Sequence, residues 1–230
     1  MAYAHVKQCS IAIYNLSQAQ GWFIILVMLI FKTANNPHGA LWDSKVVLKE
    51  EIELYQVLQA LQWFDVIFPL LGFTRSVVIN AFLQTLARSI FGFITLPMHH
   101  PYVPVTLPVM YCFAAGEGTR YLYNLFTILG IQKTMLGRVV GHLRWNLFLI
   151  LYPIGALGDG LAGCFTVPVL KAMDPMPYSM TMPNKYNFSW NMAYGLTVMP
   201  FIYMLQFPIN FGHLLRKRRE FYAEALYKEV

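Results

Sequence analysis

Two polar side chains within an apolar stretch have types and a spacing that suit acid–base chemistry. Tyr152 and Asp159 are seven residues apart. That is two turns of an α-helix, so both side chains point to one side with about 10 Å of rise between their Cα atoms. A phenol and a carboxylate held in a desolvated pocket can give and take protons in one reaction. The structural alternatives are a packing tyrosine and an aspartate that caps free backbone groups.

Proline and glycine surround this pair. Pro153 follows the tyrosine directly, and Gly155, Gly158 and Gly160 flank the aspartate. Proline removes a backbone donor and disfavours helical geometry in the residue before it. Glycine allows a neighbouring helix or a ligand to come close. We therefore expect a kinked, opened helix around the pair.

Other ionisable residues lie inside apolar stretches, where an unpaired charge costs several kcal/mol. They are Asp65, Arg88, Glu117, Arg120 and Arg144. Glu117 and Arg120 stand at i and i+3 on one helical face and can pair. Asp65 and Arg88 can pair between two successive helices. These charges indicate either a functional polar interior or ion pairs that only lock helix packing, and we expect them to enclose one interior with the tyrosine–aspartate pair.

The elements that must position these residues are membrane-spanning helices. Hydrophobic residues make up 57% of the 230 residues and charged residues only 12%, whereas soluble domains average about 25% charged. Stretches of about 20 apolar residues suffice to cross a bilayer, and they occur at 11–31, 54–73, 77–97, 105–131, 143–165 and 190–213. We predict an all-α, polytopic protein of six transmembrane helices in a single domain, 1–230. Lys and Arg are more frequent on the side that holds both termini, which favours a cytosolic location for that side.

Nucleic-acid and metal sites are not indicated. The formal net charge is +6, but the cations form no basic face, and the dense run Arg216–Arg219 follows the last apolar stretch as a membrane flank. Cys9, Cys112 and Cys164 are far apart, without zinc-ligand or disulfide spacing. We expect no nucleic acid, no metal and no organic cofactor.

Several motifs resemble one known family. They are Tyr14-Asn15-Leu16, Arg75-Ser76-Val77-Val78, Glu117 with Arg120-Tyr121, Leu151-Tyr152-Pro153-Ile154-Gly155, and Pro183-Asn184-Lys185-Tyr186-Asn187-Phe188. Together they resemble the very-long-chain 3-hydroxyacyl-CoA dehydratases, also called protein-tyrosine-phosphatase-like membrane proteins. Phosphatase chemistry itself is excluded, because it needs a cysteine thiolate in a C-x5-R motif, which this chain lacks.

The resemblance implies a carbon–oxygen lyase of fatty-acid elongation, with six spans in the endoplasmic reticulum membrane. The family removes water from 3-hydroxyacyl-CoA to give trans-2-enoyl-CoA, using a tyrosine and a glutamate seven residues apart. Tyr152 matches the tyrosine, and Asp159 stands at the glutamate position. For binding of a long-chain acyl-CoA or lipid we predict Arg88, Glu117, Arg120, Arg144, Lys185 and Tyr186, with elongation enzymes as partner subunits.

The aspartate also supports a different hypothesis. Aspartate is one methylene shorter than glutamate, and a displacement of about 1 Å can cost a catalytic group roughly 100-fold in rate. The alternative is therefore a catalytically impaired relative that serves as a structural or lipid-binding subunit of a large membrane complex, for example in the mitochondrial inner membrane.

Overall fold

The computed structural model describes residues 2–35, 48–74, 77–98 and 103–226, and this part of the chain is helical, as the all-α prediction requires. The elements are α1 (Ala2–Asn35), α2 (Lys49–Leu61), α3 (Phe64–Leu70), α4 (Val78–Ile90), the π-helix η1 (Phe91–Thr95), α5 (Leu96–Met98), α6 (Val103–Ile128), α7 (Met135–Lys171) and α8 (Met192–Leu226). Extended pairing within these residues is limited to an isolated antiparallel bridge between Met180 and Trp190.

Four helical stretches of the described chain are long and apolar enough to cross a membrane. They are Val6–Asn35, Val78–Met98, Met135–Lys171 and Met192–Ala223. The segment expected as a single span at 54–73 is instead broken between α2 and α3, so neither part approaches the roughly 20 residues that a span needs. The helix α6 has 26 residues, but the charges of Glu117 and Arg120 within it lower its mean hydropathy.

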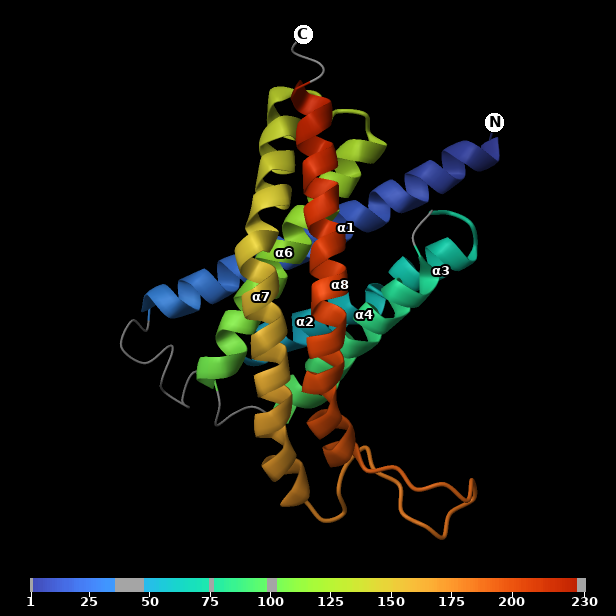
Figure 1. Cartoon of the computed structure of the whole chain (residues 1–230), viewed down its shortest axis with the longest axis vertical. Helices are drawn as coiled ribbons and strands as arrows, with labels where there is room; N and C mark the ends of the chain where they lie inside the picture. Colours follow the sequence, from blue (N-terminus) through green and yellow to red (C-terminus); the bar gives the residue numbers. More distant parts are fainter. Residues whose placement is uncertain (1, 36–47, 75–76, 99–102, 227–230) are drawn as a thin grey trace.

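Helix α6 lies at the centre of the packing. It packs against α1 on one side and α7 on the other, and α7 in turn packs along α8 (Figure 1). Large apolar side chains from α1, α2, η1 and α6 form the main core, which includes the buried Trp22, Tyr55, Phe91 and Met110. The first turn of α1 and the last turns of α8 lie toward the same end in Figure 1, opposite the connection between α7 and α8.

A glycine-dependent turn joins α3 to the segment that leads into α4. Gly72 has φ of +70°, a value that glycine adopts without strain. Its N–H donates to the Pro69 carbonyl, and the Phe73 N–H donates to the Phe68 carbonyl, which together form a Schellman motif. The turn folds α3 back toward α4, and these two helices pack against each other.

Helix α7 runs without interruption through Pro153, so the predicted opening of this helix is wrong. Proline removes only one backbone hydrogen bond, and close packing on both sides supports the rest of the helix. A methyl group at Gly158 would collide with Val109 of α6. A methyl group at Gly160 would contact Pro200 of α8. Gly158 therefore allows the close approach of α6 that was expected, whereas a methyl group at Gly155 or Gly160 would make only ordinary van der Waals contacts.

Candidate active site

The residues expected to enclose a polar interior line one large cavity of about 1230 Å³. Its walls come from α1, α3, α4, α6, α7 and α8, together with the turn after α3. The predicted residues in this lining are Tyr152, Asp159, Arg88, Glu117, Arg120 and Arg144, with Asp65 beside them. The tertiary structure thus brings together ionisable groups that lie far apart in the sequence.

Tyr152 lies on α7 and is held by aromatic stacking against α8. Its ring centroid is 5.3 Å from that of Phe207 and 6.1 Å from that of Phe211, with planes inclined by 25° and 19°. Asn210, also on α8, lines the same cavity. The tyrosine ring is therefore fixed by a wall of α8 side chains at one side of the cavity.

Asp159 lies two turns further along α7 at a buried part of the same cavity. Only 6% of the residue is exposed. Its Oδ2 atom accepts a hydrogen bond of 2.5 Å from the hydroxyl of Tyr203 on α8. Among the described residues, no lysine, arginine or histidine lies within ion-pairing distance of this carboxylate.

The other acids of the cavity are bound in a charge network. Glu117 is 2.6 Å from Arg88 and 2.6 Å from Arg120, and Arg120 is 2.8 Å from Asp65. The predicted pair of Glu117 and Arg120 is confirmed. The predicted pair of Asp65 and Arg88 is wrong, because Arg88 lies about five residues further from the α3–α4 turn than Asp65 does, or roughly 7.5 Å along a helix.

Neutral donors complete this network. The hydroxyls of Tyr14 and Tyr121 donate to the two oxygens of Asp65 at 2.9 and 2.8 Å. The Gln62 side-chain amide donates to Glu117 at 2.9 Å. Buried charges are retained at low cost only when they are paired and hydrogen-bonded. Asp65 and Glu117 meet both conditions, which leaves Asp159 as the acid of this cavity without a cation beside it among the described residues.

Arg144 supplies positive charge to the cavity from the first half of α7. Its guanidinium lies 5.4 Å from the ring of Trp145, and no acidic side chain of the described chain pairs with it. The indole N–H of Trp145, which also lines the cavity, is buried without a hydrogen-bond partner. These two adjacent donors are available to an anionic or carbonyl group of a ligand.

One exposed part of the cavity wall, on α8, carries cationic side chains, and we call it the cationic rim. His213, Arg216 and Lys217 form this rim and are exposed, whereas Asp159 in the same lining is buried. The cavity wall thus has an exposed cationic part, where Lys217 is also paired with Glu220 at 2.8 Å, and a buried part that carries Asp159. Such a charge distribution favours a ligand with a polyanionic head and a neutral tail.

Lys185 and Tyr186 are not brought to this cavity. Both are exposed on the connection between α7 and α8, which Figure 1 shows at the end of the molecule opposite the last turns of α8. The neighbouring Asn184 accepts from the Tyr186 backbone N–H at 3.0 Å and donates to the Thr181 carbonyl at 2.9 Å. This motif thus organises a loop in the structure.

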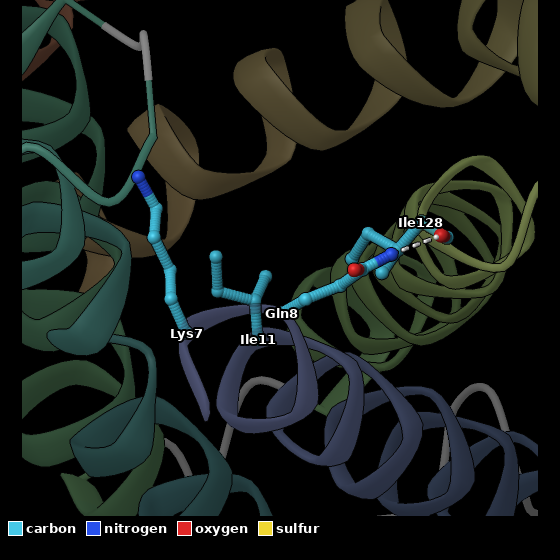
Figure 2. Close-up of a pocket in the computed structure, with 4 residues that line it drawn as sticks. All are labelled: Lys7, Gln8, Ile11 and Ile128. Carbon is cyan, nitrogen blue, oxygen red and sulfur yellow. Dashed lines mark hydrogen bonds between the residues drawn. The ribbon is translucent and has the colours of Figure 1, made fainter. Parts of the chain in front are cut away.

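A smaller pocket of about 270 Å³ adjoins the large cavity near the start of α1. Its lining residues are Lys7, Gln8, Ile11 and Ile128, and Ile11 and Ile128 line the large cavity as well. Figure 2 shows the Gln8 side chain donating to the Ile128 carbonyl, at 3.0 Å. Lys7 donates to the Gly72 carbonyl at 2.9 Å. These contacts tie α1 to α6 and to the α3–α4 turn, which frames the large cavity.

Sequence reasoning missed the contribution of α8 to the site. Tyr203, Gln206, Asn210 and His213 all line the cavity. Their spacing of three and four residues places polar groups along one face of an otherwise apolar helix. That periodic polar stripe is the signal in the sequence that could have identified them.

Comparisons with known proteins find sequence similarity over most of the chain. The family model described as protein tyrosine phosphatase-like protein, PTPLA, matches residues 59–224. The very-long-chain (3R)-3-hydroxyacyl-CoA dehydratase 1 of Canis lupus familiaris is 26% identical over 213 residues, which cover 90% of this chain and 80% of the relative. Dehydratase 2 of Mus musculus is 25% identical over 221 residues, covering 94% and 81%.

A plant protein is similar along nearly its whole length. The very-long-chain (3R)-3-hydroxyacyl-CoA dehydratase PASTICCINO 2B of Oryza sativa subsp. japonica is 25% identical over 225 residues, which cover 96% of each chain. No solved structure gives a significant match. Because the family model covers well over half of the sequence, the chain belongs to the protein tyrosine phosphatase-like, PTPLA, family.

Proposed function

We propose that this protein is a 3-hydroxyacyl-CoA dehydratase of very-long-chain fatty-acid elongation. The observation that carries the proposal is that Tyr152 and Asp159 line one cavity whose wall also includes the exposed cationic rim of α8. Relatives named as dehydratases of very-long-chain 3-hydroxyacyl-CoA match 90% or more of the chain. Carbon–oxygen lyase chemistry needs a base for the proton on one carbon and an acid for the hydroxyl group on the adjacent carbon, and this pair can supply both.

The proposed reaction removes one water molecule and leaves the enzyme unchanged. One member of the Tyr152–Asp159 pair takes the proton from C2 of the 3-hydroxyacyl thioester. The C2–H electron pair forms the C2–C3 double bond, and the C3–O bond breaks. The other member gives a proton to the departing hydroxyl, so that water and trans-2-enoyl-CoA are formed. Proton transfer back through the released water restores both groups.

The cavity also has residues that can bind the CoA head and the thioester arm of an acyl-CoA substrate. The negatively charged CoA head fits the rim formed by His213, Arg216 and Lys217, because cations there attract its phosphates. Arg144 and the unpaired Trp145 indole N–H lie along the cavity wall, where they can bind the carbonyl groups of the thioester arm. We propose that Arg88, Glu117 and Arg120 hold this wall in shape. We assign Lys185 and Tyr186 no contact with the reacting atoms.

We further propose a single membrane domain with six crossings, in which α2 with α3 and α6 cross in addition to the four long apolar stretches. Both termini then lie on the cytosolic side, where acyl-CoA is available to the cationic rim. The protein would reside in the endoplasmic reticulum membrane beside other enzymes of elongation. The alternative of a structural subunit predicts a filled space between Tyr152 and Asp159, and it is less favoured because the cavity reaches both residues.

A direct assay tests the proposed function. The purified full chain in a lipid nanodisc is incubated with a long-chain (3R)-3-hydroxyacyl-CoA, and the dehydrated product is followed by mass spectrometry. We expect turnover by the wild type and a loss of at least about 100-fold in Tyr152→Phe, because removal of a general acid or base typically costs 10²–10⁴ in rate. Tyr194→Phe is the matched control, since Tyr194 is exposed on α8.

The thermal midpoint of each variant is measured beside its rate. Tyr152→Phe keeps its ring stacking and is expected to melt within about 4 °C of the wild type. Absence of turnover by the folded wild type would overturn the enzyme assignment. Wild-type turnover by Tyr152→Phe would remove Tyr152 from the mechanism.

A further inference from the structure

Two contacts join α7 and α8 beside the cavity. The Asp159 carboxylate accepts a hydrogen bond from the Tyr203 hydroxyl, and the Tyr152 ring stacks against Phe207 and Phe211. The two helices are antiparallel, so the later residue of α7 meets the earlier residue of α8. Helix α8 therefore contacts both members of the candidate acid–base pair.

Tyr203 is well placed to fix the orientation of the shorter acid. Its hydroxyl donates to Oδ2 of Asp159, and Oδ1 has no hydrogen bond to the described residues. Both side chains line the cavity. A donor bound to one carboxyl oxygen holds the plane of the group and leaves the other oxygen for a ligand.

Helix α7 itself offers no side chain that orients the Asp159 carboxyl group, so α8 must provide one. The α7 residues three and four positions from Asp159 carry no polar side chain that could hold the carboxyl group; they are Gly155, Ala156, Ala162 and Gly163. Pro200 of α8 lies beside Gly160, so this part of α8 packs against α7. Arg88, which also lines the cavity, is bound to Glu117 at 2.6 Å, and among the described residues it forms no ion pair with Asp159.

We infer that Tyr203 is a positioning residue for the dehydration, acting through its hydrogen bond to Asp159. The inference rests on the proposed function. Tyr203 holds the carboxyl group of a short side chain to which α7 itself offers no hydrogen-bond donor. Its hydroxyl neither attacks the substrate nor replaces Tyr152, and it adds the orientation that acid–base catalysis requires.

The test compares Tyr203→Phe with Tyr194→Phe, the same chemical change at an exposed position of the same helix. With long-chain (3R)-3-hydroxyacyl-CoA as substrate, we expect kcat of Tyr203→Phe to fall roughly 10- to 100-fold, because a positioning error of about 1 Å can cost that much. KM should stay within about twofold, since Tyr203 lies far from the cationic rim. Tyr194→Phe should match the wild type. Tyr203→Gln, which restores a donor without the ring, should be intermediate in kcat.

A double-mutant cycle separates positioning from packing. If Tyr203 acts through Asp159, the loss in kcat caused by Tyr203→Phe should be much smaller in the Asp159→Asn background than in the wild type. Equal kcat for the wild type, Tyr203→Phe and Tyr203→Gln would overturn the inference while the proposed function stands. Additive losses in the cycle would overturn it as well. Absence of turnover by the wild type would overturn the proposed function, and this role with it.

Discussion

Replacement of Glu117 by glutamine should destabilise the helical bundle more than any surface charge change. Glu117 is 4% exposed and lies between Arg88 and Arg120, each 2.6 Å away. The substitution keeps the size of the side chain and its ability to accept from Gln62, but removes the negative charge. Arg120 keeps its second partner, Asp65, at 2.8 Å. Arg88 has no second ion-pair partner among the described residues and is left as an uncompensated cation.

The expected loss follows from that uncompensated charge. Breaking a buried ion pair by removing one partner costs about 3–5 kcal/mol. Because the Arg88 side chain keeps 22% exposure, we expect the lower end of that range, about 3 kcal/mol. For a chain of this size each kcal/mol corresponds to roughly 2–4 °C, so the thermal midpoint should fall by about 6–12 °C.

Glu53→Gln is the matched control. Its side chain is 64% exposed and stands 3.9 Å from Lys49, so its loss should cost less than about 0.5 kcal/mol. Thermal unfolding in a single detergent, followed by intrinsic fluorescence, gives the three midpoints. Addition of Arg88→Gln to Glu117→Gln should recover part of the loss, because it removes the uncompensated cation. A Glu117→Gln midpoint within about 2 °C of Glu53→Gln would refute a stabilising role for the network.

Three further predictions address the acid, the helix contacts and the topology. Asp159→Glu should keep or raise the dehydration rate, because the cavity can accept one more methylene group. If the protein is a structural subunit packed around the aspartate, Asp159→Glu should instead lose about 1–3 kcal/mol of stability, and neither the wild type nor the variant should turn over substrate. Gly158→Ala should cost about 1–3 kcal/mol because its methyl group meets Val109, whereas Gly163→Ala makes only an ordinary van der Waals contact, and equal melting of the two variants would contradict the packing. Single cysteines near residues 5 and 225, in a background without native cysteines, should react with an impermeant thiol reagent from one membrane side, and opposite-side labelling would exclude an even number of crossings.

The fold class was accessible from the sequence because it depends on local composition. Apolar stretches of about 20 residues predict helices in lipid, where every backbone group must be satisfied within its own segment. The Gly72 turn was predictable for the same reason, since a positive φ is a property of one residue. Composition did not determine where a helix breaks, so the interruption at Gln62–Trp63 and the continuity of α7 through Pro153 were not foreseen.

Within the candidate site, the sequence predicted the relative positions of residues that lie on the same helix. The seven-residue spacing of Tyr152 and Asp159 places both on one face, and the i, i+3 spacing of Glu117 and Arg120 makes them pair, because helix geometry alone sets these relations. Partners between helices depend on rotation, depth and tilt, which no local pattern encodes.

The packing of α1, α4, α6 and α8 around the cavity determined the rotation, depth and tilt of each helix. This packing pairs Arg88 with Glu117 and Asp65 with Arg120, and it leaves Lys185 and Tyr186 outside the cavity. It also brings Tyr203 of α8 to Asp159 across the α7–α8 contact. The sequence by itself determined which groups can do chemistry, and the tertiary structure decided which of them meet, because interhelical distances follow from the packing of side chains contributed by the whole chain.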